Sequence, residues 1–136
     1  KFTIFNKPNL KAPVIIGTIK VTKNIEIKEG SYINKECLLD AKGGNITIGK
    51  NVGIGYRCQL LTTNHSYTDK KKRTGKVIAS DITIGDGCWI GAGSIINPGV
   101  TIGDGCVIAS GSVVTRDCIS NGLYAGVPAK MIKRLE

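Results

Sequence analysis

The sequence carries an aliphatic residue at every sixth position over most of its length. From residue 84 onward this position is held by Ile84, Ile90, Ile96, Ile102, Ile108 and Val114. The fifth position of the same units is held by Cys88, Ser94, Val100, Cys106, Ser112 and Cys118. The register also runs from Ile48 to Leu60 and, earlier, from Val21 to Leu39. Because a six-residue unit cannot bury its own apolar side, the pattern predicts short strands wound into a solenoid whose neighbouring coils share one core.

Turn-forming residues fill the positions between the aliphatic ones. The chain has 18 glycines and only 5% aromatic residues, which favours tight corners around a narrow core. Asn97-Pro98-Gly99 is one such corner, since proline fixes φ and glycine accepts a positive φ. Parallel strands about 4.8 Å apart would satisfy the backbone from coil to coil. We therefore predict an all-β fold of parallel strands in one domain spanning residues 1–136.

The six-residue register is interrupted twice. After Leu39 the next interval is nine residues, which predicts a widened corner at 40–45. After Leu60 the inward pattern lapses through HSYTDKKKRTGK, which has charge and turn formers but no alternating apolar face. We predict a protruding loop at about 66–77. The only histidine of the chain, His65, lies at its root, and a loop on a rigid scaffold is a common place for functional groups. The alternative is a neutral insertion.

All the cysteines fall on the small fifth position, namely Cys37, Cys58, Cys88, Cys106 and Cys118. A functional interpretation would make them zinc ligands or a nucleophile, but the chain has no C-x-x-C pair. We predict buried core thiols instead, because free cysteine behaves as a small hydrophobe. Cys88 and Cys106 are three repeats apart, so we expect them to stack in adjacent coils near disulfide distance and to stay reduced in a cytosolic protein.

Nineteen basic and ten acidic residues give the chain a formal net charge of +9. This charge favours an anionic partner, and nucleic acid, a phosphorylated cofactor and an acidic polysaccharide all qualify. We do not expect nucleic acid, because the chain has few aromatics for base stacking and no recognisable reading helix. No apolar run approaches the ~20 residues of a membrane span, and residues 1–10 contain no signal-peptide core. We therefore expect a soluble, cytoplasmic protein.

Three stretches carry a resemblance to a known family: TNHSY with its basic loop, ITIGDGCWIGAGSIINPGVTIGDGCVIASGSVVTRD, and GLYAGVPAKMIKR. From Val21 to Arg134 the chain resembles the hexapeptide-repeat O-acetyltransferases of the galactoside, maltose and polysaccharide group. The resemblance implies a left-handed parallel β-helix, although the usual preference for right-handed crossovers would predict the opposite hand. It also implies a homotrimer with active sites between subunits and acetyl-CoA as donor. For this chain we further expect a short C-terminal helix at about 128–136.

Within that family the catalytic base is a histidine followed at a fixed interval by a Trp-Ile-Gly motif, and His65 and Trp89-Ile90-Gly91 match it. The resemblance therefore implies that neutral His65 accepts the proton of an acceptor hydroxyl as this hydroxyl attacks the thioester carbonyl. Imidazole titrates near pH 7, so one histidine suffices. The oxyanion needs separate donors, and we expect backbone N–H groups near Ala92. No carboxylate partner for His65 is evident, so we expect a backbone carbonyl to fix its tautomer.

The same resemblance assigns further residues. Those assigned to the acceptor are Asn34, Asp40 and Trp89, and those assigned to acetyl-CoA are Ala92, Ser110, Thr115, Arg116, Lys130 and Lys133. Asn34 is equally explained as an outward corner residue, and Trp89 as a packing residue. Lysines at 130 and 133 replace arginines common in the galactoside enzymes, so bidentate phosphate contacts are lost. The run Lys70-Lys71-Lys72-Arg73 either draws the anionic donor toward the site or is a solvated loop.

Other functions remain open from sequence. Hexapeptide carbonic anhydrases hold zinc with several histidines, and this chain has one, so we expect no metal. Acetylation of an amine on an amino-sugar nucleotide would use the same base and donor, and antibiotics are also acetylated on this scaffold. A non-catalytic trimeric binding scaffold would keep the repeats without needing the histidine, the Trp-Ile-Gly interval and the basic tail. We expect an O-acetyltransferase whose acceptor is a sugar or a polysaccharide precursor.

Overall fold

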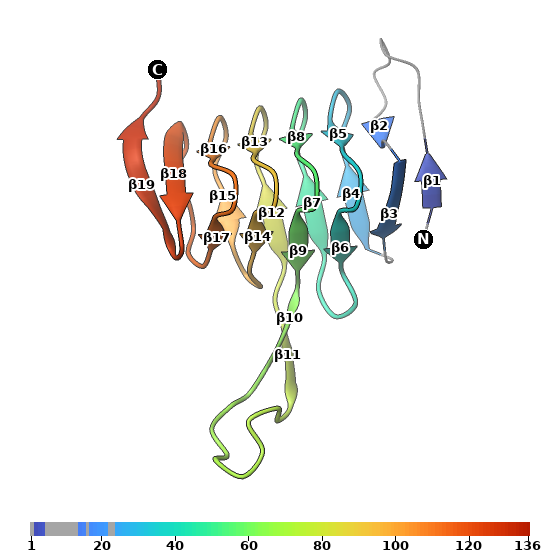
Figure 1. Ribbon diagram of the computed structural model, residues 1–136, viewed down its shortest axis with the longest axis vertical. Coiled ribbons are helices and arrows are strands. Elements are labelled where there is room, and N and C mark those ends of the chain that lie inside the picture. The colour runs from blue at the N-terminus through green and yellow to red at the C-terminus, as the bar shows by residue number, and fades with distance from the viewer. Residues whose placement is uncertain (1, 5–13, 16, 22–23) are drawn as a thin grey trace.

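The computed structural model describes residues 2–4, 14–15, 17–21 and 24–136. From residue 24 the chain visits a four-stranded, a seven-stranded and a six-stranded sheet in turn, and each coil adds one short strand to each sheet (Figure 1). Strands that neighbour each other in these sheets are parallel and in register, except for the pairs β1–β3 and β18–β19. The predicted all-β solenoid is therefore confirmed for the described residues.

The strands of the seven-stranded sheet, in order, are β2 (Val14–Ile15), β5 (Tyr32–Ile33), β8 (Gly53–Ile54), β13 (Trp89–Ile90), β16 (Val107–Ile108), β18 (Gly122–Gly126) and β19 (Ala129–Arg134). Those of the six-stranded sheet are β1 (Phe2–Ile4), β3 (Gly17–Val21), β6 (Leu38–Asp40), β9 (Gln59–Leu61), β14 (Ile95–Ile96) and β17 (Val113–Val114). Those of the four-stranded sheet are β4 (Ile25–Ile27), β7 (Ile46–Ile48), β12 (Ile82–Ile84) and β15 (Thr101–Ile102).

The core is the column of aliphatic side chains that the repeat predicts. The first-position residues from Ile84 to Val114 are at most 1% exposed, and the fifth-position residues from Cys88 to Cys118 at most 6%. The strand register places equivalent residues of neighbouring coils next to each other. For example, Ile90 pairs with Ile54 in one neighbouring strand and with Ile108 in the other. Each aliphatic side chain thus covers the one in the next coil, which a single hexapeptide has no means of doing.

Many corners between sheets contain a residue with positive φ, and glycine holds several of these positions. At the corner between the seven- and six-stranded sheets, the position is held in successive coils by Glu36, Arg57, Gly93 and Gly111, with φ of 63°, 57°, 72° and 74°. Only glycine adopts this conformation without cost. The two side chains that occupy it, Glu36 and Arg57, form an exposed ion pair across the coils.

Both interruptions of the repeat are confirmed as structural features. Residues 41–45 form the widened corner between β6 and β7. Residues 63–79 form an antiparallel hairpin of β10 (Thr63–His65) and β11 (Val77–Ala79), which projects from one edge of the solenoid (Figure 1). Its loop therefore occupies 66–76, close to the predicted span.

The predicted C-terminal helix at 128–136 is wrong. The chain reverses after Gly126, whose φ is 103°, and β19 pairs antiparallel with β18 from Gly126–Ala129 to Gly122–Arg134. The unpaired edge of the last parallel strand explains the difference, because β19 satisfies the backbone groups along that edge and a helix would leave them open.

The cysteines are confirmed as core residues. All are buried and none is in a disulfide, including Cys88 and Cys106 in adjacent coils. The Cys88 thiol donates to the Gly103 carbonyl at 3.1 Å, and burial raises the pKa of Cys88 to about 11. Burial likewise raises the pKa of Cys118 to about 12. Thiols held protonated in this way are poor nucleophiles.

Candidate active site

His65 ends strand β10, and the loop beyond it keeps the hairpin paired for one further step. The Ser66 N–H donates to the Lys76 carbonyl at 2.8 Å, and the Gly75 N–H donates to the Ser66 carbonyl at 2.9 Å. This pairing carries the Gly75 carbonyl to the imidazole of His65, where Nδ1 lies 2.8 Å from the oxygen. A carbonyl only accepts, so Nδ1 bears the hydrogen and Nε2 of the neutral ring keeps its lone pair. The expected backbone carbonyl partner is thus present.

A hollow of about 420 Å³ lies between the hairpin and the widened corner. The hairpin contributes Thr63, His65 and Val77, and the corner contributes Asp40, Lys42 and Gly43. We call this the histidine hollow. The Asp40 carboxylate is anchored at its rim, because Oδ1 accepts the Lys42 N–H at 3.0 Å. The structure therefore brings two predicted residues, Asp40 and His65, to one cavity.

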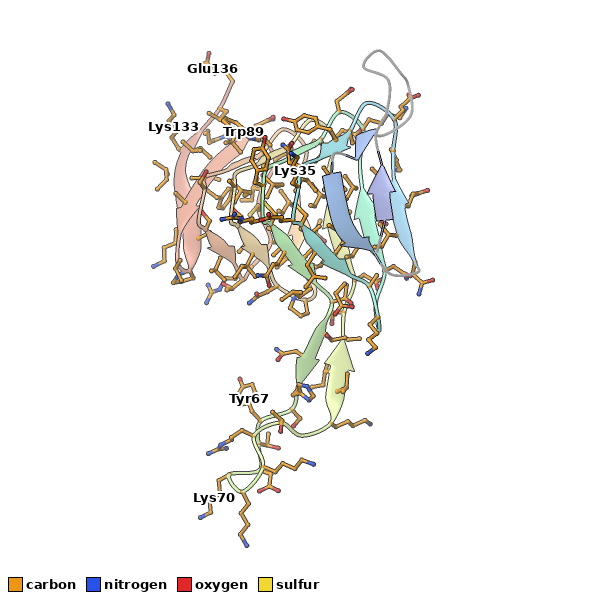
Figure 2. All side chains as sticks on the ribbon, turned by 45° about the vertical axis from the view of Figure 1, so that its right-hand side comes forward. Lys35, Tyr67, Lys70, Trp89, Lys133 and Glu136 are labelled. Carbon is orange, nitrogen blue, oxygen red and sulfur yellow. The ribbon has the colours of Figure 1, made fainter. Side chains whose placement is uncertain are left out.

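Two other predicted residues do not line the histidine hollow. Trp89 lies on the outward face of the seven-stranded sheet, is 58% exposed, and lies far from the hairpin in Figure 2. Asn34 follows β5 at a corner, where its N–H donates to the Ile54 carbonyl at 3.0 Å.

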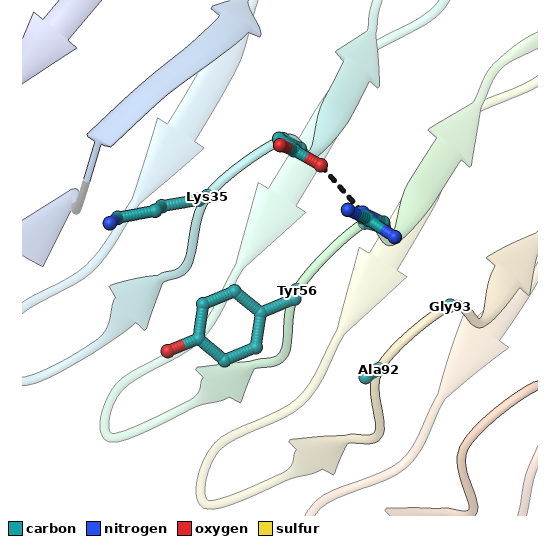
Figure 3. Close-up of a pocket in the computed structure, with 6 residues that line it drawn as sticks. Lys35, Tyr56, Ala92 and Gly93 are labelled. Atoms are coloured by element: carbon teal, nitrogen blue, oxygen red, sulfur yellow. Dashed lines mark hydrogen bonds and ion pairs between the residues drawn. The ribbon is translucent and has the colours of Figure 1, made fainter.

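Ala92 and Ser110 lie at the corner between the seven- and six-stranded sheets, in successive coils. Ala92 lines a second hollow of about 470 Å³ together with Lys35, Glu36, Tyr56, Arg57 and Gly93 (Figure 3). The Gly111 N–H donates to the Ala92 carbonyl at 2.9 Å and thereby stacks the two corners.

The N–H groups of Ala92 and Ser110 donate to no acceptor in the part of the chain that the structure describes. Glycines in the preceding coil leave room beside both groups. A Cβ on Gly55 would stand 2.8 Å from the Ala92 nitrogen, and a Cβ on Gly91 would stand 2.5 Å from the Ser110 nitrogen. These corners therefore offer two unpaired donors, one coil apart, to a ligand that lies along the edge of the solenoid.

Three of the predicted donor-binding residues gather near the C-terminal hairpin. Thr115, Arg116 and Lys130 line a hollow of about 250 Å³ with Pro128 and Ala129. Guanidinium and ammonium groups side by side suit the phosphates of a nucleotide. Lys133 lies farther along β19, opposite Leu123, and does not line this hollow.

The sequence did not single out every residue that builds these cavities. Gly75 matters through its carbonyl, and only the pairing of the hairpin reveals that it faces His65. Tyr56 lines the hollow beside Ala92 and has no sequence motif. The described residues contain no group of three or more metal-binding side chains. They also contain no helix long and apolar enough to cross a membrane.

Residues 81–116 match the family model described as bacterial transferase hexapeptide (six repeats). The galactoside O-acetyltransferase of Escherichia coli strain K12 is 39% identical over 112 residues, which are 82% of this chain and 55% of that protein. The chain spans little more than half the length of this and other curated relatives that it matches.

Solved structures of similar fold include a hexapeptide-repeat-containing acetyltransferase of Vibrio cholerae. It is 33% identical, with a TM-score of 0.85 over 92% of this chain and 72% of that one. The same Vibrio protein in complex with acetyl-CoA gives 36% identity and a TM-score of 0.80 over 87% and 64%. A maltose O-acetyltransferase of Clostridium difficile 630 is 37% identical, with a TM-score of 0.69 over 88% and 67%.

Proposed function

Because the chain belongs to the hexapeptide-repeat acetyltransferases, we propose that it transfers an acetyl group from acetyl-CoA to a hydroxyl of a sugar or polysaccharide precursor. The observation that carries this proposal is the bond between His65 Nδ1 and the Gly75 carbonyl. With its hydrogen on Nδ1, the neutral ring keeps the lone pair of Nε2 free to accept a proton, as a general base must. The left-handed winding of the coils and a cytoplasmic location are parts of the same proposal.

His65 acts as the general base in this mechanism. Its Nε2 accepts the hydroxyl proton while the acceptor oxygen bonds to the acetyl carbon, and the proton then passes to the sulfur as the C–S bond breaks. Nδ1 keeps its hydrogen throughout, and the Gly75 carbonyl stabilises the imidazolium that forms between the two steps. Base assistance of this kind typically contributes ~10²–10⁴ in rate. Asp40, at the rim of the same hollow, is placed to accept hydrogen bonds from other hydroxyls of the sugar.

Acetyl-CoA would use the unpaired donors and the basic hollow. The N–H of Ala92 would stabilise the negative charge on the carbonyl oxygen, and the N–H of Ser110 would bind an amide of the pantetheine arm. Arg116 and Lys130 would bind phosphates, with Lys133 in an outer position. The elongated pantetheine arm fits backbone N–H groups that repeat from coil to coil. The phosphates at the nucleotide end of acetyl-CoA fit the basic hollow near the C-terminal hairpin. Trp89 and Asn34 would contact the acceptor.

We propose a homotrimer in which each site lies between two subunits. One chain holds His65 and Ala92 at different corners, where they line two separate hollows. A second copy would bring the missing half to each histidine hollow. Light scattering of the purified protein would then give the mass of three chains.

The deciding experiment measures release of the CoA thiol from acetyl-CoA with a panel of sugars. His65→Ala should lose about 10²-fold or more of the acceptor-dependent rate. His65→Asn is the matched variant, because its amide can still donate to Gly75 while offering no base. Equal rates in His65→Ala and the wild type would refute the catalytic role.

N-acetylation of an amino-sugar nucleotide and acetylation of an antibiotic use the same base and donor, so the panel includes an amino sugar and an aminoglycoside. A non-catalytic scaffold would bind acceptors without releasing the thiol at all.

A further inference from the structure

The basic run at the tip of the hairpin contains two kinds of side chain. Arg73 turns back into the loop, where Nη1 donates to the Tyr67 carbonyl at 2.7 Å and contacts the Thr68 carbonyl at 3.4 Å. Asp69 forms the turn on the other side, because its Oδ1 accepts the Lys71 N–H at 2.9 Å and its carbonyl accepts the Lys72 N–H at 3.1 Å. The loop is therefore a closed, internally bonded turn.

Lys70, Lys71 and Lys72 are presented outward by this turn. All three are exposed, and Figure 2 shows Lys70 at the tip, pointing away from the body. Within residues 24–136 the ion pairs are those of Lys50 with Glu29 and of Arg57 with Glu36, so the three ammonium groups have no carboxylate partner there. Asp69 lies beside them in sequence, but its carboxylate accepts a backbone N–H. Unneutralised cations on an ordered turn attract an anion without first having to order the chain.

The position of the histidine hollow favours the acceptor, rather than acetyl-CoA, as the anion that the lysines attract. On the body, the hollow is lined by Asp40 and Lys42, from the coil before the hairpin. The basic hollow with Arg116 belongs to a later coil, because the strand order β6-β9-β14-β17 puts them on opposite sides of the hairpin base. Within one chain, the basic hollow is therefore separate from the histidine hollow. The histidine hollow remains for the acceptor.

The hairpin also exposes apolar side chains between the histidine hollow and the tip (Figure 2). Tyr67 is 71% exposed, and on the same hairpin Val77 is 56% exposed. An exposed aromatic ring on a hairpin that also carries cations suits a sugar chain, since the ring packs against C–H faces while the cations contact charged substituents. A single sugar in the hollow would not extend along the loop to its tip, but an oligosaccharide would.

We propose that Lys70, Lys71 and Lys72 select an anionic oligosaccharide as the acceptor, with carboxylate- or phosphate-bearing sugars along the hairpin and the reacting sugar in the histidine hollow. The proposal rests on the proposed acetyl transfer and names its substrate class. Asp40 does not oppose it, because this carboxylate lies at the reacting end, where the acceptor presents hydroxyls.

The test replaces the three lysines together by glutamate and leaves Arg73 intact, so that the turn keeps its closure. Acetyl transfer is measured with three oligosaccharides of equal length: one of uronic or sialic acids, one that bears phosphate groups and one that is neutral. We expect kcat/KM for the anionic acceptors to fall at least tenfold, and kcat/KM for the neutral one to stay within twofold. The wild-type rate with anionic acceptors should also fall as salt increases, because exposed charges are screened. The carboxylate and phosphate arms show which anion the lysines meet.

Lys28→Glu is the charge control, because Lys28 is exposed at a different corner of the solenoid. The proposal would be overturned if the ratio of kcat/KM for anionic acceptors to kcat/KM for the neutral acceptor were the same in the triple variant as in the wild type. A rise in KM for acetyl-CoA, with that ratio unchanged, would overturn it in favour of donor attraction.

Binding to His65→Ala separates this inference from the proposed reaction. In that background, titration calorimetry should show that the acidic oligosaccharide binds and that the three glutamates weaken binding at least tenfold. Failure of acetyl transfer in the wild type would refute the proposed function, whereas absence of this binding difference would refute the lysine proposal alone.

Discussion

Gly75→Ala tests the geometry that gives His65 its function. The added Cβ would lie 2.8 Å from the Ser66 carbonyl oxygen, a backbone atom that already accepts the Gly75 N–H at 2.9 Å. Because two backbone segments have to separate to relieve the contact, the Gly75 carbonyl should move away from Nδ1. The backbone at position 75 has no positive φ, so alanine is compatible with the conformation itself.

The expected loss of rate follows from weakening one hydrogen bond, the bond from His65 Nδ1 to the Gly75 carbonyl. A neutral hydrogen bond contributes about 0.5–1.5 kcal/mol, and about 1.4 kcal/mol corresponds to tenfold in rate. We therefore expect kcat to fall about two- to tenfold, with little change in KM for acetyl-CoA. Thr74→Ala, next to the glycine, should leave both constants unchanged.

The assay is nitrogen-15 NMR of the imidazole, which is unambiguous because His65 is the only histidine of the chain. In the wild type the neutral ring should show a protonated Nδ1 and an unprotonated Nε2. Gly75→Ala should shift the spectrum toward a mixture of tautomers. Wild-type nitrogen shifts together with a wild-type kcat would refute the role of the Gly75 carbonyl.

Two further predictions concern the donor site and the core. Arg116→Ala should raise KM for acetyl-CoA about tenfold and leave kcat nearly unchanged, because an ion-assisted contact to a phosphate remote from the reaction is lost; an unchanged KM would exclude Arg116 from the donor site. The pKa of Cys88 and of Cys118 is raised above 9.0 by burial, so between pH 9 and 11 the unfolded chain loses thiol protons that the folded chain keeps. The free energy of unfolding should therefore fall as pH rises through this window, as measured by urea denaturation, and less so in Cys88→Ala; an equal slope in both proteins would contradict the assignment.

The six-residue period predicted the core because the same position of each six-residue unit is buried. Ile90 packs on Ile54 and Ile108 at a separation fixed by the coil, so local sequence determines a contact between distant residues. The same regularity revealed the hairpin, which is where the period stops.

The C-terminal strand could not be predicted in this way. Residues 129–134, AKMIKR, include strong helix formers, and their local preference favours a helix. The free edge of β18 overrides that preference, and an edge is a property of the finished stack. The candidate site likewise has one part that a single chain determines and another part that it does not. Asp40 and His65 line one cavity within one chain. The proposed approach of Ala92 to His65 depends on the proposed trimer, and the six-residue period does not encode an assembly of chains.

Strand β19 has a consequence for the behaviour of many molecules in solution. A solenoid that ended on β18 would expose a row of unpaired amides and carbonyls to which the first coil of another chain could add, and repeated addition would build a fibre. Strand β19 pairs with this row and, as the outer strand of the sheet, carries Lys130, Lys133 and Arg134. Charged side chains on an edge strand oppose pairing with a strand of another molecule. The residues proposed to hold the phosphates of the donor thus also disfavour the addition of a further strand at this edge.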